Sequence, residues 1–551
     1  MLSFLKINLP ILIIILILFS YLGIKAFNED GWDGWGFGSA QTLMSSQYWA
    51  KDGFAKNYFL FIPSPYSKLI KYLDEPEFRN RSIETLDGAL NRNRTYYTHY
   101  PPLYLAPYAL LAKIGIESRS IFRIFSILIS LSALFLFYLF TKSISTKAIA
   151  TIASIYYGFS VTFLNYADSI SIQPWTILFT FLILNLSIPA WRNIDSPKKY
   201  RRYNFYIWFA YLTLSLSSFD ATFFVFAYLI LFDVFILKKF LWKKWLFFAS
   251  APVLGFALQV VQNTWYFGWQ NMASDFYRYY TERAIGNAKN FIIGIAAPFV
   301  SMTGIKTFYF FKKTLVALGS AVLIIGILWK LRPKLNIDSN FFKIIGILTV
   351  AAITQPFFLN VTGWWPYQGV LAAPFWGLLI GVSSVFIINA LRKKELNIYK
   401  TLSFWILTAI ILMLWSAQFY NASVYAKNWP NNQVPKEVIE FSKTIKNIHP
   451  NEEKLTFRML PQNSAWKSQF PVFNFEYYLA MPKVDFANIQ DLLVDFWWFR
   501  NISEYPFYSF IIAENKSDIE KIREELISKD IKNISPITEI QGQYLFIVAP
   551  K

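Results

Sequence analysis

The feature that most constrains this chain is a series of apolar segments separated by short basic connectors. Each segment has roughly 17 to 25 residues, the length of a helix that crosses a bilayer core about 30 Å thick. Hydrophobic residues make up 55% of the 551 residues, and charged residues only 16%. This balance excludes an ordinary soluble protein of this size and predicts a mainly α polytopic membrane protein.

The formal charge of +19 comes largely from Lys and Arg residues in connectors such as Lys198–Arg202 and Lys238–Lys244. We interpret them as topology determinants that stay in the cytoplasm, and not as a surface for nucleic acid. Placing them inside predicts eleven transmembrane helices and an extracytoplasmic C-terminus. The predicted spans are Leu9–Ile24, Ile121–Phe140, Ala148–Tyr166, Ile172–Ala190, Phe205–Ser218, Ala221–Leu237, Trp245–Val261, Leu315–Leu331, Phe342–Leu359, Gly369–Ala390 and Leu402–Ala422.

The eleven-span count depends on the segment Leu103–Leu111, within a large first outer loop at 26–120. This segment is short, interrupted by Pro107 and rich in tyrosine, which favours an interfacial helix over a span. Counting it as a span would move Lys238–Lys244 outside. A transmembrane domain is thus expected at 1–424, with a seven-helix module at 1–262 and a second outer loop and further helices at 263–424.

From about Tyr425 the sequence mixes polar and apolar residues, which predicts a small extracytoplasmic α/β domain at 425–551. Ser517 and Glu520 form a capping-box pattern that marks the start of a helix. The strand-like runs around it are Leu455–Leu460, Phe507–Ala513 and Tyr544–Val548.

Two residue types limit the available chemistry. Cysteine is absent, so thiol nucleophiles and cysteine-based metal sites are excluded. The only histidines in the sequence are His99 and His449, which also excludes a site built from several histidines.

The first apolar segment, Leu9–Ile24, follows Lys6 and could be mistaken for a cleaved signal peptide. It has no cleavage site of small residues before Lys25, so we expect it to be retained as a signal anchor.

Acidic residues from four separate segments are expected on the outer side. Carboxylates beside a bilayer are costly unless solvated or paired, so their convergence favours a functional site over solvated helix ends. Such groups can deprotonate a hydroxyl, and together they could hold a divalent cation. The set is Glu29, Asp30, Asp33, Asp168, Asp220 and Glu282.

Basic and aromatic residues accompany this acidic set. Arg123, Arg278 and Arg283 could grip phosphate oxygens in forked geometry. For the loop that holds Arg278 and Arg283, an interfacial tyrosine belt with snorkelling arginines is an equal alternative. His99 precedes an extended turn that contains two prolines, and its imidazole could bond a phosphate or a sugar hydroxyl.

The stretch from His99 to Trp191 contains the motif His99-Tyr100-Pro101-Pro102-Leu103-Tyr104, followed by Gly115-Ile116 and Arg123-Ile124-Phe125-Ser126. This pattern resembles membrane glycosyltransferases of the GT-C superfamily that use polyprenyl- or dolichyl-phosphate sugars, such as protein mannosyltransferase-like and aminoarabinose-transferase-like enzymes. The resemblance implies a seven-helix module whose first outer loop contains interfacial helices and the catalytic aspartate. Asp33 is the best counterpart, with Gly34 where relatives have an acidic partner, so Asp30 and Glu29 remain alternative bases.

The sequence hypothesis is therefore an inverting glycosyltransferase, with Asp33 as base and a polyprenyl-phosphate-linked donor. The substrate-binding candidates are His99, Tyr100, Arg123, Asp168, Asp220, Arg278, Glu282 and Arg283. No cofactor is expected to be obligatory, although Glu29, Asp30 and Asp33 could hold a divalent metal ion. The acceptor would be a glycan, a lipid or a protein, and the expected location is a bacterial inner membrane. The alternative is a non-enzymatic transporter of lipid-linked glycans or a polymerisation partner.

Overall fold

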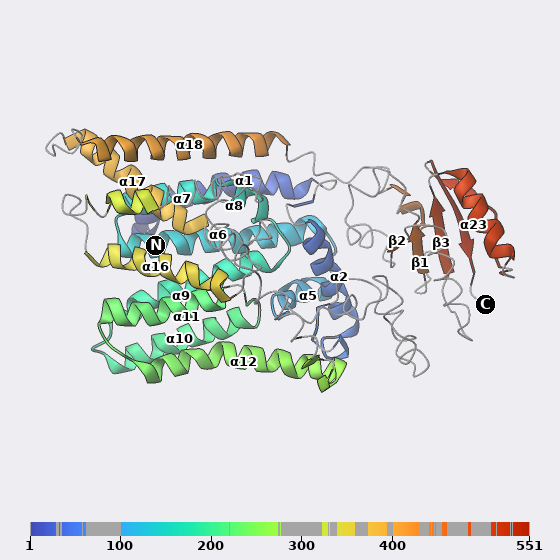
Figure 1. Ribbon diagram of the computed structural model, residues 1–551, viewed down its shortest axis with the longest axis horizontal. Coiled ribbons are helices and arrows are strands. Elements are labelled where there is room, and N and C mark those ends of the chain that lie inside the picture. The colour runs from blue at the N-terminus through green and yellow to red at the C-terminus, as the bar shows by residue number, and fades with distance from the viewer. Residues whose placement is uncertain are drawn as a thin grey trace.

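The computed structural model describes residues 2–28, 32–33, 36–57, 59–61, 101–219, 221–270, 272–273, 276, 322–328, 330, 339–358, 373–393, 401–428, 440–441, 443–445, 447, 455–459, 483–485, 508–513, 515–528, 531, 533–540 and 542–549. These residues form a helical bundle and, beyond one end of it, a small sheet near the C-terminus (Figure 1). The predicted combination of a mainly helical membrane part with a small α/β module is confirmed at this level.

The bundle helices follow ten of the eleven predicted apolar segments, whereas the eighth, Leu315–Leu331, is described only at 322–328 and 330. They are α1 (Leu2–Phe27), α6 (Arg119–Ile144), α7 (Lys147–Gly158), α8 (Val161–Tyr166), α9 (Ile172–Arg192), α10 (Pro197–Ser215), α11 (Thr222–Phe232), α12 (Trp242–Phe267), α16 (Ser339–Phe358), α17 (Ala373–Lys393) and α18 (Leu402–Asn428). A π-helical turn, Asp233–Leu237, extends α11. Buried side chains from all these α-helices form one continuous apolar core.

Six helices in the described part of the chain are long and apolar enough to cross a membrane. They are Asn8–Phe27, Arg119–Ile144, Ile172–Arg192, Trp242–Trp265, Ala373–Arg392 and Leu402–Lys427. Two shorter apolar helices, Thr222–Leu237 and Asn340–Ala351, accompany them. The chain is an integral membrane protein, and the count of eleven spans stays a prediction.

The third predicted span, Ala148–Tyr166, consists of two helices in the structure. α7 ends at Gly158, and α8 begins at Val161. Ser160 starts the second helix because its side-chain oxygen accepts a hydrogen bond from the Phe163 amide at 3.1 Å. The apolar pattern continues through this cap, so hydrophobicity alone could not locate the break.

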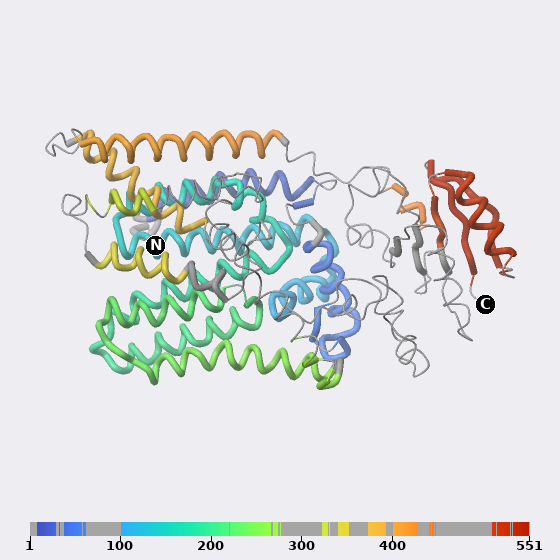
Figure 2. The backbone as a smooth tube through the Cα atoms, viewed as in Figure 1, coloured from blue at the N-terminus to red at the C-terminus, as the bar shows by residue number. Residues whose placement is uncertain are grey.

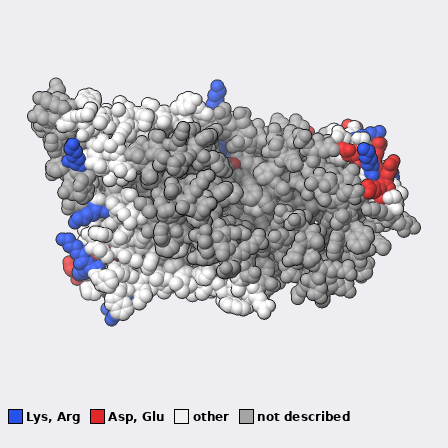
Figure 3. Space-filling view, in the orientation of Figure 1, with Lys and Arg blue, Asp and Glu red and all other residues white. Residues whose placement is uncertain are grey.

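The basic connectors meet at the end of the bundle that lies away from the sheet. Lys142 donates to Asn8 Oδ1 at 3.0 Å, which joins the start of α1 to the end of α6. Lys244 Nζ lies 5.4 Å from the centre of the Tyr200 ring, which joins the starts of α10 and α12. In Figure 3, exposed Lys and Arg side chains of the bundle gather mostly at this end. The connectors predicted to share one side of the membrane therefore do lie together.

Short helices from the first predicted outer loop lie at the opposite end of the bundle (Figure 2). They are α2 (Gly36–Asp52), the 3-10 turn η1 (Ala55–Asn57) and α5 (Leu105–Lys113). α5 has nine residues, so it is about 14 Å long and too short to cross a bilayer. The predicted short helix is therefore present, and its place at the membrane interface stays a prediction.

The C-terminal module is a mixed sheet of five strands with one helix. The strands are β1 (Leu455–Met459), β2 (Lys483–Asp485), β3 (Tyr508–Ala513), β4 (Thr538–Ile540) and β5 (Gln543–Val548), in the order β2-β1-β3-β5-β4. β1 pairs in parallel with β2 and β3, and β5 pairs antiparallel with β3 and β4. The three predicted strands are all present. The domain boundary at 424 stays a prediction, since α18 continues to Asn428.

The helix of this module, α23 (Lys516–Ser528), buries Ile519, Ile522 and Leu526. It begins one residue before Ser517, so Ser517 lies in its first turn and is not the N-cap. The predicted helix is confirmed. The prediction that Ser517 caps the start of this helix is wrong, because the helix already begins at Lys516.

Candidate active site

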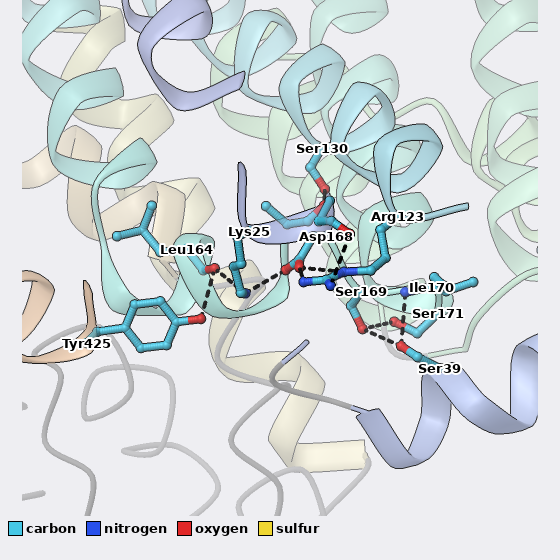
Figure 4. A network of polar contacts seen from close by, with 12 residues as sticks. Lys25, Ser39, Arg123, Ser130, Leu164, Asp168, Ser169, Ile170, Ser171 and Tyr425 are labelled. Atoms are coloured by element: carbon cyan, nitrogen blue, oxygen red, sulfur yellow. Dashed lines mark hydrogen bonds and ion pairs between the residues drawn. The ribbon is translucent and has the colours of Figure 1, made fainter. Parts of the chain in front are cut away.

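Asp168 is buried between two cations from different helices. Lys25, in the last turn of α1, donates from Nζ to Asp168 Oδ1 at 2.8 Å. Arg123, in α6, donates from Nε to Asp168 Oδ2 at 3.1 Å and contacts the same oxygen through Nη2. The three side chains are at most 2% exposed. Each carboxylate oxygen therefore has its own cationic partner (Figure 4).

Backbone carbonyls and a tyrosine complete the surroundings of the two cations. Lys25 also donates to the Leu164 carbonyl at 3.2 Å, and Arg123 donates from Nη1 to the Ala26 carbonyl at 3.3 Å. Tyr425 of α18 donates to the same Leu164 carbonyl at 3.2 Å, and its ring centre lies 5.5 Å from Lys25 Nζ. Three helices, α1, α6 and α18, therefore converge on the segment that contains Asp168.

Asp33 lies in the same buried region, in the segment between α1 and α2. Its side chain is 3% exposed. The neighbouring Trp32 packs against Arg119, whose guanidinium carbon lies 4.6 Å from the ring centre. This cation–π contact ties the Asp33 segment to the start of α6.

A row of hydroxyl groups joins α2 to the loop between α8 and α9 (Figure 4). Ser39 of α2 accepts a hydrogen bond from the Ile170 amide at 3.0 Å and lies 3.4 Å from Ser169 Oγ. Ser169 and Ser171 bond each other at 2.7 Å, and Ser171 donates to Gln173 Oε1. The loop that holds Asp168 is therefore fixed to the helix that follows Asp33.

The two carboxyl groups have opposite electrostatic environments. Burial raises the pKa of Asp33, and the negative charge of Asp168 raises it further. Arg123, Ser39 and Lys25 lower this pKa by a smaller amount, so it stays above its usual value. Burial also acts to raise the pKa of Asp168, but Lys25 and then Arg123 outweigh it and hold that pKa below its usual range. Asp168 is thus a fixed anion, whereas Asp33 can exchange a proton closer to neutral pH.

The structure brings together three of the sequence-predicted residues, namely Asp33, Arg123 and Asp168. Arg123 was predicted to bind phosphate, and in the structure its guanidinium bonds Asp168 and a backbone carbonyl. The other candidates lie outside the described residues: Glu29, Asp30, His99, Tyr100, Asp220, Arg278, Glu282 and Arg283.

Sequence reasoning missed two residues of this site, Lys25 and Ser39. A lysine at the end of an apolar helix is itself a signal, because an ionisable residue at the edge of a membrane span usually has a partner. Ser39 gave no signal, since a single serine in a helix is common and its partner amide is 131 residues away in sequence.

The predicted metal site is only partly covered by the structure. Among the residues that are described, no three His, Cys, Asp or Glu side chains group closely enough to hold a metal ion. Two of the three suggested ligands, Glu29 and Asp30, fall outside that part of the chain. Asp168 already has two cationic partners, so its oxygens do not fit a further cation. A metal held by Glu29, Asp30 and Asp33 stays a prediction.

Comparison with known proteins gives a clear result only at the level of structure. No protein-family model and no curated protein matches the sequence. Among solved structures, ArnT from Cupriavidus metallidurans bound to undecaprenyl phosphate is similar with a TM-score of 0.54 and 11% identity, over 98% of each chain. The Archaeoglobus fulgidus oligosaccharyltransferase tethered to an acceptor peptide has a TM-score of 0.51 and 11% identity, over 93% of this chain and 70% of its own.

The match to ArnT extends over nearly the whole of both chains, including the C-terminal sheet. This chain shares the fold of ArnT and of the oligosaccharyltransferase. The resemblance that the sequence motifs indicated is therefore confirmed for the fold. At 11% identity the similarity establishes the architecture, and the chemistry has to be argued from the residues of this chain.

Proposed function

We propose that this protein is a membrane glycosyltransferase that transfers a sugar from a polyprenyl-phosphate-linked donor to an acceptor hydroxyl on the extracytoplasmic side. The observation that carries the proposal is the pair of buried carboxyl groups with different environments. Asp168 is held by Lys25 and Arg123, and the pKa of the nearby Asp33 is raised. Two acids whose pKa values are pushed apart are typical of sites that transfer protons during catalysis.

In the proposed reaction, the acceptor oxygen attacks the anomeric carbon of the sugar while the bond from that carbon to the phosphate oxygen breaks. Asp33 takes the proton of the acceptor hydroxyl, and the polyprenyl phosphate leaves as an anion. One such displacement inverts the anomeric configuration. A base with a raised pKa suits this step, because general bases work best when their pKa lies near the working pH.

We assign Lys25 and Arg123 to holding Asp168, which fixes the loop beside Asp33. Binding of the lipid phosphate and the sugar is proposed for the candidates outside the described residues. These are His99, Tyr100, Asp220, Arg278, Glu282 and Arg283, with Glu29 and Asp30 as alternative bases. Undecaprenyl phosphate is bound in the ArnT structure, which supports a polyprenyl phosphate as the lipid of the donor.

The rest of the architecture fits this proposal. A transmembrane domain at 1–424 would place the site at the outer face of a bacterial inner membrane. The α/β domain at 425–551 would help to bind a glycan, lipid or protein acceptor. The oligosaccharyltransferase that shares the fold was solved with an acceptor peptide, which keeps a protein acceptor among the candidates.

The test is transfer of radiolabelled sugar in membrane vesicles that contain the protein and a panel of undecaprenyl-phosphate-linked hexoses and pentoses. Asp33→Asn should lower transfer by at least about 100-fold, since a lost general base typically costs 10²–10⁴ in rate. Asp52→Asn is the matched control, because Asp52 lies at the exposed end of α2. Gel filtration and thermal unfolding would verify that both variants fold.

Full transfer by Asp33→Asn would remove Asp33 from the mechanism. If the wild-type protein transfers no sugar but moves the labelled lipid across the vesicle membrane, and does so equally well without Asp33, the non-enzymatic transporter is the correct function.

A further inference from the structure

Two neighbouring helices, α10 and α12, share an aromatic ladder along the outer seam between them (Figure 1). The ladder consists of Phe205 and Trp208 of α10 and Phe247 of α12. The first two rings stack with centroids 6.2 Å apart and the last two with centroids 5.7 Å apart, at interplanar angles of 22° and 23°. Trp208 also donates to Ser250 Oγ of α12 at 2.9 Å, which fixes its ring between the two helices.

The aromatic ladder is exposed on the outside of the bundle. Phe205 is 53% exposed and Phe247 41%. α12 is long and apolar enough to cross a membrane, and only 22% of its most apolar stretch is buried inside the protein. The outer side of such a helix contacts lipid chains. A ligand that covers the ladder therefore needs an apolar body.

A cation lies one helical turn before the ladder on each helix. Arg201 precedes Phe205 by four residues on α10. Lys243 likewise precedes Phe247 by four residues on α12. Residues four apart share a helix face, so the two cations lie on the same seam as the rings, toward the basic end of the bundle. The apolar surface thus ends at two positive charges.

These two charges are not neutralised within the described part of the protein. The next lysine of α12, Lys244, turns inward and binds the buried Asp233 at 2.7 Å. Arg201 and Lys243 are both exposed, and neither forms an ion pair with any residue that the structure describes. Their charges are therefore available to an anion from outside the chain.

We propose that the outer seam of α10 and α12 binds an anionic phospholipid from the membrane leaflet at the basic end of the bundle. The lipid phosphate binds Arg201 and Lys243, because guanidinium and ammonium groups both bind phosphate oxygens. One acyl chain covers the aromatic ladder. Nucleic acid and small soluble anions do not fit, since they have no apolar part for the exposed rings. The site lies at the end of the bundle away from Asp33 and Asp168, and the inference does not rest on the proposed function.

The experiment measures, by native mass spectrometry, how the purified full-length protein in detergent binds phosphatidylglycerol and phosphatidylcholine with the same acyl chains. The wild type should bind phosphatidylglycerol at least about 10-fold more tightly, since a basic residue beside an anionic lipid surface contributes roughly fivefold. Arg201→Gln/Lys243→Gln should weaken phosphatidylglycerol binding by about 10- to 30-fold and leave phosphatidylcholine binding unchanged. Lys147→Gln/Arg392→Gln is the control, because it removes two exposed charges outside the seam, and it should keep wild-type affinities.

A second pair of variants tests the apolar half of the site. Phe205→Ala should weaken the binding of both phospholipids by about fivefold, because less apolar surface is covered. Phe209→Ala is the matched control, since Phe209 is 59% exposed on the same helix and lies outside the aromatic ladder. It should bind both lipids like the wild type. Thermal unfolding verifies that all variants fold.

Three results would overturn the proposal. Equal affinity of the wild type for the two phospholipids would remove the anionic headgroup as the recognised feature. Equal losses in the two charge variants would show a general effect of net charge and not a site at the seam. Competition by glycerol phosphate at the lipid concentrations used would show that a soluble anion binds without an acyl chain.

Discussion

Replacing Lys25 by methionine tests the central claim that Asp168 is held as an anion by two cations. Methionine has a similar length and keeps the apolar contacts of the lysine stem, so the main change is loss of the ammonium group. In the native structure this group lies 2.8 Å from Asp168 Oδ1, and both side chains are almost fully buried. Lys25→Met would leave that oxygen without its cation.

Breaking a buried ion pair from one side typically costs about 3–5 kcal/mol, because the remaining charge is left buried. Arg123 still bonds the other carboxylate oxygen in this variant, so we expect the lower end, about 3 kcal/mol. This corresponds to roughly a 100-fold change in the folding equilibrium.

The measurement is denaturant unfolding in detergent micelles, followed by the fluorescence of the 20 tryptophans. Lys142→Met is the control, because Lys142 is half-buried at the opposite end of the bundle and donates to the neutral Asn8 side chain. Its loss should cost about 1 kcal/mol. The double variant Lys25→Met/Asp168→Asn should lose about 2 kcal/mol less than the sum of its single variants, since both charges are then gone.

Two results would refute the reasoning. If Lys25→Met costs no more than Lys142→Met, the ammonium group does not stabilise Asp168. If the losses of the two single variants simply add in the double variant, Lys25 and Asp168 are not coupled.

Two further predictions concern pH and packing. Asp33 acts as a base only when ionised and its pKa is raised, so the transfer rate should fall as pH drops through a value above the usual aspartate range. Asp168→Asn removes a negative charge beside Asp33, so the fall should move to lower pH in the rate profile; an unmoved midpoint would contradict this. A Cβ atom at Gly381 of α17 would lie 2.9 Å from α7, so Gly381→Ala should lose about 1–3 kcal/mol in thermal unfolding. Gly346→Ala, with open space around it, should be neutral or slightly stabilising, and equal losses would refute the packing argument.

The sequence alone determined where the chain forms long helices. Hydrophobicity over some twenty residues is a local property, so α6, α9 and α18 lie where the apolar segments predicted them. The short length of the α5 segment was also readable, because a helix of nine residues cannot cross a bilayer. The break before α8 was not, since it depends on one side-chain cap at Ser160.

The sequence also indicated several residues of the site, but it did not indicate which residues form contacts with one another. Asp33, Arg123 and Asp168 were candidates because charged residues beside apolar helices need partners, but several partners were available for each. Only the tertiary structure joins Asp168 to Lys25, 143 residues earlier, and Ser39 to the Ile170 amide. Distances across the bundle decide these contacts, and no local pattern encodes them. The fold thereby makes Asp168 a fixed anion and leaves Asp33 as the carboxyl group whose proton can move.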